Sequence, residues 1–413
     1  METSHVTTAA PSRPLSQVFP LGIVLLGALA HATGAWAACE AIDHGMRADG
    51  SDNIAALTKT LAECAGQKIH IAHGVYTFSP NGLAPGITIP ADTELGGDGA
   101  EGPQQTVFRV ADSGNFRSFF WVRNVSNVGI GGIRFEGTTY ESGCTRHLDY
   151  GHAIYVQSDS AQSAGVESVH IANNAFHNFN GQSWITVNAA ESSPGIGLHS
   201  SIAINNNVFD SDAKLSGGCA PSGGIGYPVA MVWLHGSDQS ANGLVANVVV
   251  ESNTFNAGYV KDAVAIWVGT RMVNVENNTI RDVGQQLPPA PGTELGRYAI
   301  LVYNSAHKPV ALAPEGVRIA RNSITNPVSC GIYVAGGRSL EITENRISGQ
   351  SDRHDVTLPK GAIALNHAEN VTALRDNELT ANYIGISIVG GSVNMGTNRI
   401  TAAVGGTSQK IVR

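Results

Sequence analysis

Val250-Glu251-Ser252-Asn253-Thr254-Phe255 and, 25 residues later, Val275-Glu276-Asn277-Asn278-Thr279-Ile280 follow one pattern. In both, an asparagine stands two residues before an apolar residue and after a short β-like run. The pattern occurs eight times along the chain, with asparagines at Asn174, Asn207, Asn253, Asn278, Asn322, Asn345, Asn377 and Asn398. Successive asparagines are 21 to 46 residues apart, and a minimum near 21 to 25 with variable excess is typical of a solenoid whose coils carry insertions.

The composition agrees with a protein of short strands and tight turns. The 413 residues include 48 glycines, and only 14% of the residues are charged. The net charge of −8 gives no electrostatic basis for binding nucleic acid or an anionic membrane surface. A solenoid of this length counts as one domain.

The first 37 residues differ from the rest of the chain. Arg13 is the only arginine or lysine before an apolar stretch from about Val18 to Ala30, and Ala35-Trp36-Ala37 follows. These are the charged, apolar and cleavage regions of a secretory signal peptide. We therefore expect residues 1–37 to be a signal peptide, the mature protein to be secreted or periplasmic, and no membrane span.

Export permits disulfides, and the chain has five cysteines. Cys39 and Cys64 flank the N-terminal segment, whereas Cys144 and Cys219 lie in long polar insertions. We expect these four to form disulfides, with Cys144 linked to Cys219. Cys330 begins an apolar strand and is expected to be a buried free thiol. Since no CxxC motif or Cys/His cluster is present, no metal site is predicted.

Residues 38–90 predict an N-terminal cap and a first coil. Asp52 precedes a run in which Ile54, Leu57 and Leu61 share one helical face. A strand over residues 68–72 and a turn at 74–76 follow. A helix here would cover the open end of the solenoid, which otherwise exposes unpaired strand edges.

This segment also carries a family resemblance. Ala48-Asp49-Gly50-Ser51-Asp52-Asn53-Ile54-Ala55-Ala56, together with Gly74-Val75-Tyr76, resembles the N-terminal segment of the pectate lyase/polygalacturonase superfamily. The eight asparagine repeats resemble the coils of the same superfamily, so the resemblance covers nearly all of the mature chain. It implies an all-β fold: a single-stranded right-handed parallel β-helix over residues 91–413, with a short N-terminal capping helix.

Each coil is predicted to hold three short strands, two around the asparagine and a third of the type [Ala/Gly]-Ile-x-Val. The third strands are predicted at residues 153–156, 184–187, 231–234, 265–268, 299–302, 331–334, 362–365 and 385–388. The longest insertions are residues 136–151, 177–183, 190–201, 210–228, 284–297, 303–315 and 348–360. Since most of them precede the third strand, they should wall a groove over one sheet.

Strand alternation turns the middle residue of Ile-x-Val outward. The predicted outward row is Tyr155, Thr186, Trp233, Trp267, Leu301, Tyr333, Ala364 and Ser387. The next outward row is Gln157, Asn188, His235, Gly269, Tyr303, Ala335, Asn366 and Val389. Aromatic faces on an exposed sheet suit sugar rings; the alternative is packing beneath a folded-over loop. The predicted substrate-binding residues are Tyr155, Trp233, Trp267, Tyr303, Tyr333 and Asn188.

The residue types on this sheet favour uronate chemistry over hydrolysis. Glycoside hydrolysis needs two carboxylates, and similar polygalacturonases carry aspartates on these strands, whereas here the predicted strands have none. Gly151-His152-Ala153 only half-matches their Gly-His-Gly motif. β-Elimination or C5 epimerisation of a uronic acid needs a base and a positive partner for the substrate carboxylate. The predicted catalytic residues are His235, Arg271, Arg297, Asp262 and Lys360, with His235 and Asp262 at opposite edges of the sheet, roughly 20 Å apart.

The predicted function is therefore that of an exported protein acting on an extended, uronate-containing polysaccharide by β-elimination or C5 epimerisation. No cofactor is predicted except that Ca²⁺ use stays open. The alternatives are a non-catalytic carbohydrate-binding, adhesin-like or structural β-helix and, third, a glycoside hydrolase. A homotrimer is compatible with the short tail after Ile400.

Overall fold

The computed structural model describes residues 39–79, 86–110, 118–137, 151–157, 165–179, 183–189, 199–212, 229–237, 244–287, 297–304, 310–350, 361–381, 384–402 and 407–412. Ala38–Arg413 form one compact unit. The signal-peptide prediction, Cys144, Cys219, Lys360 and most of the insertions lie outside the described residues.

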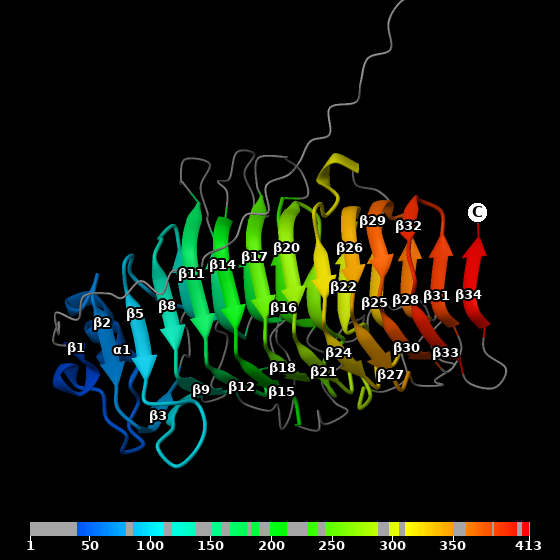
Figure 1. The fold of residues 1–413 in the computed structure, drawn as a ribbon. Coiled ribbons are helices and arrows are strands. Elements are labelled where there is room, and N and C mark those ends of the chain that lie inside the picture. The colour runs from blue at the N-terminus through cyan, green and yellow to red at the C-terminus, as the bar shows by residue number, and fades with distance from the viewer. Residues whose placement is uncertain are drawn as a thin grey trace, which may run out of the picture. The chain divides into compact units, whose positions relative to one another are not determined.

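The described chain winds through three long sheets whose neighbouring strands pair in parallel (Figure 1). Each coil contributes one strand to each sheet, so the predicted parallel β-helix is confirmed.

Sheet A precedes the asparagine turn in every coil. Its strands are β1 (Cys39–Glu40), β2 (Lys68–Ile71), β5 (Glu94–Gly97), β8 (Val128–Gly131), β11 (Val166–Ala172), β14 (His199–Asn205), β17 (Val245–Glu251), β20 (Thr270–Glu276), β23 (Arg318–Ala320), β26 (Arg338–Thr343), β29 (Glu369–Arg375) and β32 (Val393–Met395).

Sheet B follows the asparagine turn. Its strands are β3 (Gly74–Phe78), β6 (Thr106–Val110), β9 (Ile133–Glu136), β12 (Ala175–His177), β15 (Val208–Asp210), β18 (Thr254–Asn256), β21 (Thr279–Arg281), β24 (Ser323–Thr325), β27 (Arg346–Ser348), β30 (Glu378–Ala381) and β33 (Arg399–Ala402).

Sheet C contains the strands of the [Ala/Gly]-Ile-x-Val type. Its strands are β4 (Ile87–Thr88), β7 (Ser118–Arg123), β10 (His152–Gln157), β13 (Ser183–Asn188), β16 (Ala230–His235), β19 (Asp262–Ile266), β22 (Ile300–Tyr303), β25 (Cys330–Ala335), β28 (Gly361–Asn366), β31 (Ile384–Val389) and β34 (Thr407–Val412).

The eight repeated asparagines form one continuous ladder between sheets A and B. In a typical step, Asn278 Nδ2 donates to Val250 O and to Asn322 Oδ1, both at 2.9 Å. Asn278 Oδ1 accepts from the backbone N–H of Asn253 at 2.9 Å. Seven of the eight asparagines are buried, Asn398 at the last step is partly exposed, and their amides are bonded to neighbouring coils, so the predicted structural role is confirmed.

Aromatic stacking continues the same regularity inside the coils. Phe135, Phe176, Phe209 and Phe255 lie on successive sheet B strands with stacked rings, and neighbouring centroids are 4.7 to 5.0 Å apart. All four are 0 to 1% exposed. The core is therefore a repeated column of side chains rather than one central cluster.

The N-terminal cap contains η1 (Ala41–His44) and α1 (Ile54–Glu63), whereas the only other described helical turn is η2 (Val310–Leu312). Leu57 and Leu61 of α1 are buried in the core, as the helical pattern predicts. Asp52 Oδ1 accepts from Ile54 N at 3.3 Å and from Ser79 N at 2.9 Å. A disulfide joins Cys39 to Cys64, with Cα atoms 6.0 Å apart, and ties β1 to the end of α1.

Candidate functional site

Sheet C presents three rows of side chains on its outer face. Along each strand of sheet C the first residue points outward and the next two residues point into the core. After them, outward and inward residues alternate. Phe119 and Phe120 are one such inward pair. The first row is Ser118, His152, Ser183, Ala230, Asp262, Tyr298, Cys330 and Gly361. The second row is Trp121, Tyr155, Thr186, Trp233, Ala265, Leu301, Tyr333, Ala364 and Ser387. The third row is Arg123, Gln157, Asn188, His235, Trp267, Tyr303, Ala335, Asn366 and Val389.

The predicted place of Trp267 is wrong by two residues. Trp233 pairs with Ala265, so the strand is Asp262–Ile266 rather than residues 265–268. Trp267 N donates to Leu234 O at 2.8 Å, which puts Trp267 beside His235 in the third row. Gly269, predicted for that place, instead makes the turn to sheet A with φ +68°, where a Cβ would lie 2.7 Å from Ser237 N.

The four aromatic rings nevertheless form one patch. The His235 ring stacks on Trp233 with centroids 5.1 Å apart, and Trp267 lies edge-on to both, at 5.3 Å from Trp233 and 5.6 Å from His235. Tyr303 continues the patch at 5.1 Å from Trp267. Within the described part of the chain, no acceptor bonds the buried Nε1–H of Trp233 or of Trp267. We call Trp233, His235, Trp267 and Tyr303 the aromatic patch.

From His235 onward the third row is more exposed than the second, whereas Gln157 and Asn188 of the third row are only 1 and 6% exposed. Tyr155, Trp233 and Tyr333 are only 3 to 7% exposed, so the expectation of an open second row is wrong. Together with Leu301 and Tyr298, Trp233 and Tyr333 belong to a hydrophobic cluster on the outer side of sheet C, distinct from the core. His235, Trp267 and Tyr303 have intermediate exposure. A ligand in this structure would therefore reach the third row.

Asp262 is a strand residue, which corrects the prediction that the strands of this sheet carry no aspartate. Asp262 begins β19 and pairs with Ala230 of the neighbouring strand β16. Because Ala230 stands five residues before His235 on β16, Asp262 and His235 lie at opposite edges of the sheet, as predicted. Asp262 Oδ1 accepts from Tyr298 N at 2.9 Å, and the residue is 2% exposed. Burial raises the pKa of Asp262 to about 7, against smaller lowering effects of the Tyr298 N–H and Lys261.

Two of the predicted cationic residues lie away from the patch. Arg271 is on sheet A, because Gly269 turns the chain directly from sheet C into β20; its Nε lies 3.6 Å from Glu315 Oε2. Arg271 therefore does not belong to the sheet C face, and its predicted place is wrong. Arg297 is on the first-row side, next to Tyr298, and is 4% exposed. Its side chain occupies the space over Gly284, where a Cβ would lie 2.9 Å from Arg297 Cγ.

A polar group at β10 and β13 was missed by the sequence reasoning. His152 Nδ1 lies 2.6 Å from Ser183 O and 3.1 Å from Thr186 Oγ1, and the His152 ring contacts Tyr155 with centroids 5.0 Å apart. Because His152 is 1% exposed, it holds β10 and β13 together through these contacts and is not accessible to a substrate as a base. Its sequence signals were the half-match of Gly151-His152-Ala153 to a Gly-His-Gly motif and the position of His152 directly before an Ala-Ile-x-Val strand.

Asn188, a predicted binding residue, is held firmly in the third row. Its Nδ2 donates to Tyr155 Oη at 2.8 Å, and its carbonyl lies 3.0 Å from His199 Nε2. His199 Nδ1 accepts from Val166 N at 3.1 Å, so Nε2 carries the proton. Burial lowers the pKa of His199 to about 4, which keeps this bridge neutral.

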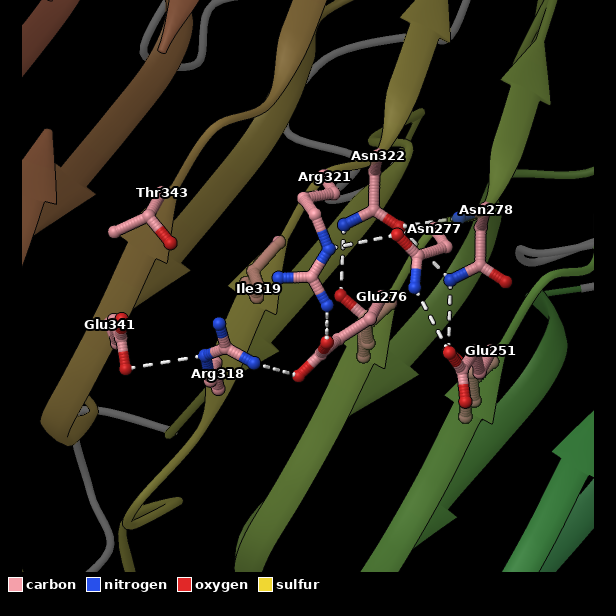
Figure 2. Close-up of polar contacts among 12 residues, drawn as sticks. Glu251, Glu276, Asn277, Asn278, Arg318, Ile319, Arg321, Asn322, Glu341 and Thr343 are labelled. Carbon is pink, nitrogen blue, oxygen red and sulfur yellow. Dashed lines mark hydrogen bonds and ion pairs between the residues drawn. The ribbon is translucent and has the colours of Figure 1, made fainter. Parts of the chain in front are cut away.

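Sheet A carries a network of charged contacts that crosses several coils. Figure 2 shows Glu276 between Arg318 and Arg321, and Arg318 Nε also lies 3.3 Å from Glu341 Oε2. A hollow of about 440 Å³ beside this network is lined mainly by Asn247, Asn274, Met272, Ser339 and Arg318. Since the charges here neutralise one another across coils, the network explains cohesion of sheet A rather than catalysis.

Two groups of described side chains have metal-ligating composition. His177, Asp210 and Asp212 lie together at the end of sheet B, where His177 Nε2 is 3.0 Å from Asp212 Oδ1. Burial, followed by the charge of Asp212, raises the pKa of Asp210. The second group is Cys39, His44 and Cys64 in the cap. Neither group lies on the outer face of sheet C, and the Ca²⁺ expectation stays a prediction.

Cys330 is a thiol in the first row, outside the Cys39–Cys64 disulfide, and is fully buried, as expected. Burial raises its pKa to about 12, so this thiol is not a nucleophile at neutral pH. No helix among the described residues is long and apolar enough to cross a membrane.

Comparison with known proteins supports the fold. Residues 264–408 match the family described as "Right handed beta helix region". No curated protein matches the sequence. The surface protein and adhesin PfbA of Streptococcus pneumoniae is similar in structure at 14% identity, with a TM-score of 0.60 over 91% of this chain and 100% of that one.

Two further solved structures are similar. The pre-mature gene product 12 of bacteriophage phi29 shares 15% identity, with a TM-score of 0.51 over 91% of this chain and 52% of that one. The A-module of the Azotobacter vinelandii mannuronan C-5 epimerase AlgE6 shares 15% identity, with a TM-score of 0.45 over 90% of this chain and 97% of that one. At sequence identities this low, the similarity shows a shared fold and nothing about activity. The chain is a right-handed parallel β-helix protein.

Proposed function

We propose that this chain is an exported carbohydrate-active β-helix that binds an extended polysaccharide along the third row of sheet C. The aromatic patch is the observation that supports this most. Trp267 and Tyr303 offer half-exposed ring faces to the apolar faces of sugars.

The residue types favour uronate chemistry over hydrolysis in this proposal. Asp262 is the only carboxylate in the described outer rows of sheet C, and it is buried against Tyr298 N. Hydrolysis by the usual mechanism needs two carboxylates that face the scissile bond. A single base suffices to abstract the C5 proton of a uronate, and His235 is the titratable base within the patch. The positive partner that the substrate carboxylate requires is left open between a cationic side chain and Ca²⁺.

The proposal is tested by measuring the reaction products. Purified protein is incubated with alginate, pectate and a glycosaminoglycan while the ultraviolet absorbance of unsaturated uronate is recorded. Solvent deuterium incorporation at C5, read by NMR, reports epimerisation. Turnover that is lost in His235→Ala and retained in Arg271→Ala supports the proposal. Turnover unaffected by His235→Ala contradicts the assignment of the base.

A non-catalytic carbohydrate-binding or adhesin-like protein is the second candidate. It is favoured by the separation of the predicted catalytic groups, because Arg271 is on sheet A while Asp262 and Arg297 lie at the opposite edge from His235. Binding of a polysaccharide without unsaturated product or deuterium uptake would support this candidate against the enzyme.

A further inference from the structure

The N-terminal cap brings three soft or borderline ligand atoms to one point, away from sheet C. Cys39 is in β1, His44 ends η1, and Cys64 follows α1. His44 Nε2 lies 3.1 Å from Cys39 Sγ and 3.3 Å from Cys64 Sγ. The two sulfurs are joined as a disulfide in this structure.

The orientation of His44 is fixed from its other side. Glu63 Oε2 lies 2.5 Å from His44 Nδ1, and an ionised carboxylate can only accept, so Nδ1 carries the proton. In the neutral ring, Nε2 then presents a lone pair to two sulfurs that also carry lone pairs. Three electron-rich atoms that face one another are complementary to a cation. A carboxylate behind a ligating histidine is the arrangement that zinc sites commonly use.

We propose that the reduced cap is a metal site in which Cys39, Cys64 and His44 bind a zinc-class divalent ion and Glu63 positions His44. A dithiol reduces the disulfide to two thiols by giving up two electrons and two protons and becoming a disulfide itself; with a phosphine, the phosphorus gives the two electrons, and water supplies the two protons and the oxygen of the phosphine oxide. Metal binding then releases the two thiol protons, and water or another donor completes the tetrahedral site. The proposal is independent of the polysaccharide function.

The site would act as an alternative cross-link. The disulfide joins β1 to the end of α1, and the metal would join the same elements together with η1. The cap would thus stay closed under reducing conditions, when the covalent bond is absent. Sequence reasoning did not detect this group, because its three ligands are separated by 5 and 20 residues rather than by a CxxC spacing.

The experiment uses the Cys144→Ser/Cys219→Ser variant, which removes two other thiols. The oxidised protein is folded, reduced with a phosphine, freed of metal and titrated with Co²⁺ under anaerobic conditions. We expect one Co²⁺ per chain, a sulfur-to-cobalt charge-transfer band, and displacement by Zn²⁺. The same protein left oxidised should show no band.

His44→Ala keeps both cysteines and forms the disulfide before reduction, so it separates metal binding from folding. We expect it to lower Zn²⁺ affinity, measured by chelator competition, and to abolish the rise in melting temperature that Zn²⁺ gives the reduced protein. Glu63→Ala should weaken Zn²⁺ binding by about 10- to 100-fold, with partial recovery in Glu63→Gln. Absence of the band, or equal affinity in His44→Ala, would overturn the proposal.

Discussion

Trp233 and Trp267 touch across neighbouring coils, with ring centroids 5.3 Å apart, but they differ in exposure. Trp233 is 7% exposed, whereas Trp267 is intermediate. We expect Trp267→Ala to weaken glycan binding by more than about 1 kcal/mol with little loss of stability. Trp233→Ala should lower the free energy of unfolding by about 3–5 kcal/mol. Calorimetric binding and urea unfolding would measure the two effects.

The control for this pair is Met272→Ala. Met272 is 54% exposed and lies on sheet A, so its removal should change neither quantity. If Trp267→Ala binds glycan as tightly as the unmodified protein, the third row is not the binding surface.

Asp262 makes stability depend on pH. Its pKa is raised by burial from 3.8 to about 7, so between these values the unfolded carboxyl loses its proton while the folded one keeps it. Stability should therefore fall as pH rises from about 4 to about 7 and then stay level, by at most about 4 kcal/mol. Asp262→Asn retains an oxygen for Tyr298 N and should remove this decline. Urea unfolding at a series of pH values tests it, and an unchanged slope in the variant would contradict it.

At the scale of the element, the asparagine ladder determines how much the free energy of unfolding falls when one ladder asparagine is replaced. Asn278 bonds both neighbouring coils through its amide, so Asn278→Ala leaves buried donors and an acceptor unbonded. We expect it to destabilise the protein by about 2–4 kcal/mol. Asn398, at the last described step of the ladder, is partly exposed, and Asn398→Ala should cost less. Equal losses in urea unfolding would show that the ladder is not the source of the cost.

The strand registers show where sequence reasoning stops at this scale. The asparagine turn was predictable, because its signature lies within six residues and the same bonds recur in every coil. The position of β19 was not, because residues 263–266 and 265–268 both fit the strand pattern. Pairing of Val264 with Val232 decides between them, and that contact spans an insertion whose length hides the phase.

At the scale of the whole molecule, the fold could be predicted from the asparagine repeat. The exposure of the candidate site could not, because it depends on the chain segments that pack over sheet C. Outward direction on sheet C could be inferred from alternation for the second and third rows, except at β19, where the predicted strand was displaced by two residues. The burial of Tyr155, Trp233 and Tyr333 could not, since it depends on how chain segments pack over the sheet. The first row escaped prediction because two successive inward residues break the alternation.

For the whole molecule, the length of the third row predicts how affinity changes with the length of the bound oligosaccharide. From His235 to Val389 the row crosses six strands of sheet C, and five steps of about 4.8 Å give roughly 24 Å. This matches an oligosaccharide of a few sugar units. Affinity for uronate oligosaccharides, measured by calorimetry, should therefore rise with each added unit and level off once the chain spans the row. An affinity already maximal for a monosaccharide would instead indicate a closed pocket, because a row of separate platforms gains binding energy only as each platform is covered.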